Sequence, residues 1–159
     1  MEQPVWFSSG TQTSPVGLKD VPYNYKIPVL GIPSASVWVS SGSLPPGISL
    51  SSSTGLLSGT PSAVGNYSFT ITADNGLGLP TSRAFSFTVN QSPSITSNTS
   101  IQGAYGDLMN LQIESTGIPS VNSYVLQGSV PSGVSINSNT GLITVDPTTA
   151  SGNFSFSVT

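Results

Sequence analysis

The sequence contains no cysteine and no histidine. The absence of cysteine excludes disulfides, thiolate metal sites and cysteine nucleophiles. The absence of histidine removes the commonest general base and the commonest metal ligand of proteins. The many serines then lack an obvious activating base, so we predict that the chain is not an enzyme and that it has no catalytic residues.

Charge is also scarce, with three basic and six acidic residues and a net charge of −3. Lys19, Lys26 and Arg83 are too few and too scattered to bind phosphates, so nucleic acid is not an expected partner. No run approaches the ~20 apolar residues of a membrane span, so we expect no membrane insertion. Because 36% of the residues are hydrophobic, we predict a folded chain with a weakly charged surface. Such a surface suits contact with other subunits of an assembly or with a ligand on a host surface.

The most informative feature that is present is an internal repeat. The segment that begins at Leu44 is similar to the segment that begins at Val130. Three pairs of turn residues stand 86 positions apart: Gly47 and Gly133, Gly55 and Gly141, Pro61 and Pro147. A repeat of this length is long enough for a small domain. We therefore predict two tandem domains, residues 1–90 and residues 91–159.

Strand patterns are frequent, whereas helix patterns are almost absent. The segments 67–73, 84–89 and 154–158 alternate apolar with hydroxyl-bearing residues, and 13 prolines and 17 glycines interrupt the chain. This alternation predicts strands with one face on a core and one hydroxyl-rich face in water. About seven such strands in about 90 residues indicate an all-β fold of two tandem immunoglobulin-like β-sandwich domains.

Two aromatic residues occupy matching places in the repeat, Trp38 and Tyr124. A large aromatic side chain buries roughly 150–250 Å², so we predict that both are core anchors. The alternative is an exposed platform on which a sugar ring stacks.

The second copy ends at Thr159, the residue that corresponds to Thr72 of the first copy. We therefore expect the second domain to lack its last strand, which residues 84–89 supply in the first domain. An open sheet edge invites the addition of another strand. Either the chain is a piece of a longer protein, or a neighbouring chain supplies the strand within an assembly.

Residues 44–76 carry motifs of a known family: Leu44-Pro45-Pro46-Gly47, Thr54-Gly55-Leu56, Ser58-Gly59-Thr60-Pro61, Gly65-Asn66-Tyr67 and Ala73-Asp74-Asn75-Gly76. They resemble the immunoglobulin-like and cadherin-like (dystroglycan-type) repeats of bacterial surface and phage proteins. The second copy keeps residues 130–133 and 140–142 but departs from the pattern at 145–147. The resemblance implies a β-sandwich that acts as a spacer, stalk or adhesive module, and it supplies no catalytic residues.

Calcium is the one metal that the resemblance suggests as a ligand. Cadherin-like repeats bind it near domain junctions, and Asp74, Asn75 and Asp107 are the candidate ligands. Calcium takes roughly six to eight oxygen ligands, whereas this chain has six carboxylates spread over two predicted domains. The alternative is that Asp74-Asn75-Gly76 forms an ordinary turn. We expect no cofactor, with calcium as the open alternative.

These patterns favour a non-catalytic structural or adhesive module, most of all a component of a phage capsid or tail. The start at Met1 shows no secretory signal pattern, which tilts the prediction toward the virion surface. The alternatives are a repeat of a bacterial cell-surface adhesin and a carbohydrate-binding module. In the last case Tyr23, Tyr25 or Tyr105 would stack on sugar rings.

Overall fold

The computed structural model describes residues 2–8, 15–98, 100, 102, 106–146, 153 and 155–159. These residues form strands and turns without a helix, which confirms the all-β prediction. The chain divides into two compact units, Met1–Ser92 and Pro93–Thr159. The sequence placed the boundary two residues earlier, at 90/91.

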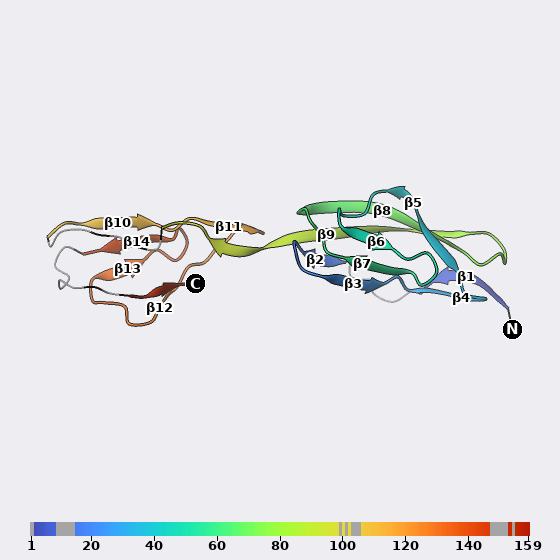
Figure 1. Cartoon of the computed structure of the whole chain (residues 1–159), viewed down its shortest axis with the longest axis horizontal. Coiled ribbons are helices and arrows are strands. Elements are labelled where there is room, and N and C mark those ends of the chain that lie inside the picture. The colour runs from blue at the N-terminus through green and yellow to red at the C-terminus, as the bar shows by residue number, and fades with distance from the viewer. Residues whose placement is uncertain are drawn as a thin grey trace. The chain divides into compact units, whose positions relative to one another are not determined.

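The strands of unit 1 are short except for the last two, which form its main hairpin (Figure 1). In chain order they are β1 (Gln3–Phe7), β2 (Val16–Leu18), β3 (Tyr23–Lys26), β4 (Val29–Ile32), β5 (Ser36–Gly42), β6 (Ile48–Leu50), β7 (Leu56–Gly59), β8 (Gly65–Asp74) and β9 (Thr81–Ile95). The residues of β9 from Pro93 onward belong to unit 2.

Two layers of strands enclose the core of unit 1. One sheet has the order β5-β8-β9, all antiparallel, and β2 joins β9 in parallel. The other layer contains the sheet β3-β7-β6 and the ribbon β1-β4. Sequence patterns missed β2 and β4, because each is short and contains a glycine. Gly17 of β2 lies so close to the Phe87 ring that a Cβ there would stand 3.0 Å from it.

The alternation of β8 and β9 places one row of side chains in this core. Phe69, Ile71, Phe85 and Phe87 are all buried, and the Phe69 and Phe85 rings stack with centroids 5.9 Å apart. From the opposite layer, Leu57 joins the same apolar cluster. The hydroxyl-bearing residues between these apolar positions therefore face away from the core.

Unit 2 repeats much of this arrangement with shorter strands. They are β10 (Met109–Gln112), β11 (Ser115–Ile118), β12 (Leu126–Gln127), β13 (Val134–Ile136), β14 (Leu142–Val145) and β15 (Ser157–Val158). Its described strands form the sheet β10-β14-β13 and the pair β12-β15, while β11 pairs with β9. The repeat residues Pro147 and Phe154 lie outside the described residues.

Equivalent hydrogen bonds establish the correspondence of the two units. Ile27 N donates to Gly55 O at 2.8 Å, and Ile113 N donates to Gly141 O at 3.0 Å, with both residues shifted by 86 positions. The same shift relates two cis peptide bonds, Ile32–Pro33 and Ile118–Pro119. The repeat seen in the sequence is therefore a repeat of the fold.

The prediction that Trp38 is a core anchor was wrong, because its side chain is 42% exposed. Val37 is the buried residue at 2% exposure, and its amide donates to Ser52 O. In unit 2 the amide of Tyr124 donates to Ser138 O, so the counterpart of Tyr124 is Val37. One extra residue after the second cis-proline changes the shift from 86 to 87, and a slip of one residue reverses the face of a strand.

For Tyr124 the prediction is confirmed, since this side chain is 8% exposed and packs with Ile113 and Ile143. Its ring lies against Gly141, where an added Cβ would meet it at 3.1 Å. A Cβ added at the equivalent Gly55 would meet Val37 at 3.6 Å. A large ring in one unit and a smaller side chain in the other thus fill the same place in the core.

The edge of β15 differs from that of its counterpart β8. In unit 1, β8 pairs with β5 on one side and with β9 on the other. In the described part of unit 2, β15 pairs with β12 alone. Phe156 and Val158 are only partly buried there, whereas their counterparts Phe69 and Ile71 lie fully inside.

Substitutions at neighbouring positions of β5 test the register of this strand. We expect Val37→Ala to lower the free energy of unfolding by about 2 kcal/mol, because it removes buried methyl groups and leaves a cavity. Trp38→Ala should cost less than about 1 kcal/mol, as expected for an exposed position. Thermal and urea unfolding of each variant measure both values. A larger loss for Trp38→Ala than for Val37→Ala would contradict the assigned faces.

Candidate functional site

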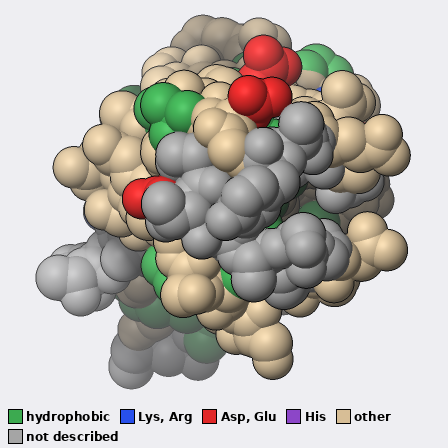
Figure 2. Space-filling model, turned by 90° about the vertical axis from the view of Figure 1, so that its left-hand side faces the viewer, with side chains coloured by type: hydrophobic (Ala, Val, Ile, Leu, Met, Phe, Trp, Pro, Cys, Tyr) green, Lys and Arg blue, Asp and Glu red, His purple; other side chains and the backbone are tan. Residues whose placement is uncertain are grey.

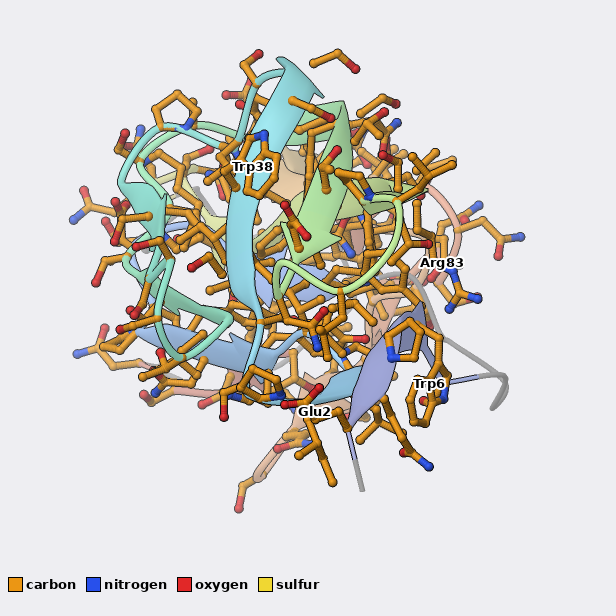
Figure 3. All side chains as sticks on the ribbon, turned by 90° about the vertical axis from the view of Figure 1, so that its right-hand side faces the viewer. Glu2, Trp6, Trp38 and Arg83 are labelled. Carbon is orange, nitrogen blue, oxygen red and sulfur yellow. The ribbon has the colours of Figure 1, made fainter. Side chains whose placement is uncertain are left out.

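The outer face of the sheet β5-β8-β9 carries one aromatic side chain among small polar ones. Figure 3 shows Trp38 standing on β5, well apart from Trp6, which lies with β1. We call the part of this surface around Trp38 the Trp38 face. By strand alternation, and by the pairing of Ser41 with Thr70 at the irregularity in β5, it comprises Ser36, Trp38, Ser40, Ser41, Ser68, Thr70, Thr72, Asp74, Ser82, Ala84 and Ser86.

Three hydroxyl groups on the Trp38 face form a chain across the strands. Thr72 Oγ1 lies 2.8 Å from Ser40 Oγ and 2.7 Å from Ser82 Oγ. Thr72 is 7% exposed, whereas Ser40 and Ser82 are exposed. Trp38 is the register partner of Thr72 in β8, so the indole stands beside the centre of this chain.

The hydroxyl protons in this chain have one consistent direction. Thr72 has a single hydroxyl proton and donates it to Ser40, so Ser82 must donate to Thr72. Ser40 in turn donates to Thr70 O at 3.3 Å. All three protons are thus used inside the protein, and the exposed Ser40 and Ser82 present acceptor lone pairs to the solvent.

The Trp38 face has almost no charge. Arg83 lies on β9 but pairs with Ile71 on the core side, where its guanidinium stands 5.2 Å from the Phe7 ring centroid and donates to Ser8 O. Asp74, at the end of β8, is the one ionisable side chain of the face. The face therefore suits an uncharged ligand better than a phosphate or a carboxylate.

The fold does not require an aromatic residue at position 38. In unit 2 the pair that corresponds to Trp38 and Thr72 is Val125 and Thr159. The backbone amide of each of these residues donates to the carbonyl oxygen of the other. Val125 is 50% exposed. A small apolar residue therefore occupies this exposed place in unit 2, so Trp38 is an addition to the shared scaffold.

Two of the tyrosines that the sequence offered for sugar stacking lie elsewhere. Tyr23 and Tyr25 are half-buried on β3 and pack against the core, with the Tyr23 ring centroid 4.7 Å from that of Phe87. Burial, together with the neighbouring Tyr25, raises the pKa of the Tyr23 hydroxyl above its ordinary value. Tyr105 lies outside the described residues.

The calcium candidates of unit 1 take part in turn hydrogen bonds. Asp74 Oδ1 accepts from Gly76 N at 2.9 Å, and Asn75 Oδ1 accepts from Leu77 N at 3.2 Å. The amide group of Asn75 donates to Gln3 O and to Pro33 O. Asp107 is exposed in unit 2.

Over the described ranges, no three His, Cys, Asp or Glu side chains form a group that could hold a metal ion. The absence of a cofactor stays a prediction of the sequence, with calcium as its alternative.

A cavity of about 190 Å³ lies near the start of β4 and the turn that contains Gly55. Its described lining includes Lys26, Ile27, Val37 and Thr54, and Lys26 is the one ionisable residue among them. A single lysine in a small pocket offers no pair of groups for acid–base chemistry.

A second exposed tryptophan has quite different neighbours. Trp6 of β1 is 41% exposed and pairs with Leu30 of β4, and Ile32 follows two residues later on the same side of that strand. Both Leu30 and Ile32 are exposed. The surface around Trp6 is therefore apolar, whereas the surface around Trp38 is hydroxyl-rich.

The family of the chain follows from its first unit. Residues 4–90, more than half of the chain, match the family described as "Putative Ig domain". The chain therefore belongs to this family of immunoglobulin-like domains, as the motifs of residues 44–76 predicted. Domains of this family are generally non-catalytic and typically extracellular or displayed on a surface. No curated protein matches the chain.

Solved structures with a similar fold contain several immunoglobulin domains. The titin I-band fragment I67–I69 has a TM-score of 0.56 at 15% identity over 92% of this chain. Immunoglobulin domains 1–4 of Sidekick-1 give 0.56 at 14% over 91%, and the insect immune protein hemolin gives 0.54 at 15% over 92%. The chain covers 56%, 41% and 40% of these structures, respectively, which is less than two thirds of their length. At such identities the likeness shows the fold alone.

Within the part of the chain that the structure describes, no helix has the length and apolar character to cross a membrane.

The hydroxyl chain of Ser40, Thr72 and Ser82 was not found from the sequence. The alternation of β8 and β9 predicted their outward faces, but only the pairing of the strands brings the three side chains together.

Calcium can be tested directly by chelation. Because the side chains of Asp74 and Asn75 already bond within their loop, we expect EDTA to leave the melting temperature unchanged. A ligand that binds only the native state must raise the melting temperature when it is added. Calorimetry with EDTA and with added CaCl₂ measures this effect, with Asp107→Asn as a further variant. A rise with calcium that this variant abolishes would establish a site.

Proposed function

We propose that this chain is a non-catalytic structural and adhesive module displayed on the surface of a larger assembly. The observation that carries the proposal is that the residues repeated between the two units are structural ones. The two units share core positions, turn glycines and cis-prolines, such as Gly55 with Gly141 and Pro33 with Pro119. Repetition of a scaffold without repetition of a reactive group suits a spacer that holds a binding surface at a distance.

The setting that we propose is the virion surface of a phage, on a capsid or a tail. The weakly charged surface supports this setting, because it allows close packing against other subunits with little repulsion. Figure 2 shows a few acidic side chains among the described residues of one face, most of which are drawn as uncharged. Display on a bacterial cell surface, as part of an adhesin, is the alternative.

A partner surface is proposed at the free edge of β15, which would take up a strand from a neighbouring chain. Phe156 and Val158 are partly buried, and among the described residues β15 pairs with β12 alone, whereas β8 also pairs with β9. Unit 2 also contains no lysine or arginine, and lysine is the residue that most often guards an edge strand. The occupant would have the pattern of residues 81–89, with apolar residues at every second position.

Immunogold labelling tests the setting. We expect antibodies against this chain to label phage particles purified from the host that carries the gene. Labelling of intact cells without labelled particles would favour the adhesin. Absence of label from both particles and cell surfaces would contradict surface display. Antibodies adsorbed with the purified chain provide the control.

A peptide with the sequence of residues 81–90 tests the proposed edge. We expect it to slow hydrogen exchange at β15 and to raise the melting temperature of the 159-residue chain. The control peptide carries Phe85→Asp and Phe87→Asp, which keep the backbone donors but remove the apolar cover. Equal effects of both peptides, or no effect of either, would contradict strand addition.

A further inference from the structure

The surroundings of Trp38 differ from those of a protein contact site. A stable protein interface buries roughly 800 Å² on each partner around an apolar core. On the Trp38 face the indole is the only large apolar side chain, and the other residues are serines, threonines, one alanine and one aspartate. Trp6, by contrast, stands with Leu30 and Ile32 on an apolar surface. The two exposed tryptophans of unit 1 therefore fit different partners.

We propose that the Trp38 face binds a neutral glycan, with one pyranose ring stacked on Trp38 and its hydroxyl groups bonded to Ser40 and Ser82. The inference deepens the proposed adhesive role, on which it rests. A pyranose ring has an apolar face of C–H groups that matches an indole, and a rim of hydroxyl groups that match protein hydroxyls.

The direction of the hydroxyl chain fixes how the sugar would bond. Because the protons of Ser82, Thr72 and Ser40 are all donated within the protein, the exposed oxygens act as acceptors. A sugar hydroxyl beside Trp38 would then donate to Ser40 or Ser82. Thr72 is only 7% exposed, so it acts as a positioning residue that orients the other two hydroxyls.

The charges of the face indicate a neutral sugar. Asp74 is in the same row as Thr72, two residues further along β8, and would repel the carboxylate of an acidic sugar. The nearest cation on this sheet, Arg83, points to the core side and is engaged with Phe7 and Ser8. The face thus offers no positive group to a uronic acid or a sulfated sugar.

Tryptophan fluorescence provides the test, since the chain contains only two tryptophans. In the Trp6→Phe variant of the full chain, Trp38 is the single reporter. Cellohexaose, chitohexaose, xylohexaose and maltohexaose are each titrated to millimolar concentrations, because one stacking ring supports only weak binding. We expect a saturable change in emission with at least one of them, and none with a galacturonic acid hexamer.

Variants separate the roles of the side chains. We expect Trp38→Ala to weaken binding about tenfold or more, measured by calorimetry, whereas the matched Trp6→Ala leaves it unchanged. Thr72→Val should weaken binding by about threefold or more, and Thr72→Ser should restore it, because serine keeps the hydroxyl that orients its neighbours. Circular dichroism verifies that each variant is folded.

Two results would overturn the inference: no saturable signal with any neutral hexamer, or binding that Trp38→Ala leaves intact. Both are independent of the immunogold result. Labelled particles with no glycan binding would support the proposed surface module and contradict this ligand. Glycan binding without surface label would support the site and contradict surface display.

Discussion

The burial of one apolar row between two strand layers is the constraint on which the rest of this structure depends. Phe69, Ile71 and Phe87 fill the space between the β5-β8-β9 sheet and the layer that contains Leu57. Because side chains alternate along a strand, the intervening residues must point outward. Since most of these intervening residues are serine or threonine, the outer face is rich in hydroxyl groups. The pairing of β8 with its two neighbours then brings three of the hydroxyls into one hydrogen-bonded chain.

The segment after the cis-proline is one residue longer in unit 2 than in unit 1, and this difference in length decides which aromatic residue is buried. From Pro33 to Val37 there are four positions, and from Pro119 to Tyr124 there are five. The core of unit 2 accepts the tyrosine ring against Gly141, while the core of unit 1 accepts a valine. The tryptophan of unit 1 is thereby left on the surface. A difference of one residue in a short segment thus leaves one aromatic residue buried in its core and the other exposed.

This separation agrees with a general property of immunoglobulin-like sandwiches, in which the scaffold and the binding surface vary independently. The turns around Gly55 and Gly141 and the two cis-prolines are common to both units because they position strands. The Trp38 face and the edge of β15 each belong to one unit alone. A tandem of like domains can therefore present different surfaces while the core contacts stay the same.

The sequence by itself determined the all-β class, the repeat and the family, because glycines, prolines and period-two alternation are local signals that need no partner. It also identified Tyr124 as a core residue. It could not place Trp38, since the face of a strand depends on register, and register depends on which residue of β5 pairs with Thr72. The meeting of Ser40, Thr72 and Ser82 was likewise decided only by tertiary structure, because hydrogen bonds between strands join residues that are distant in the chain.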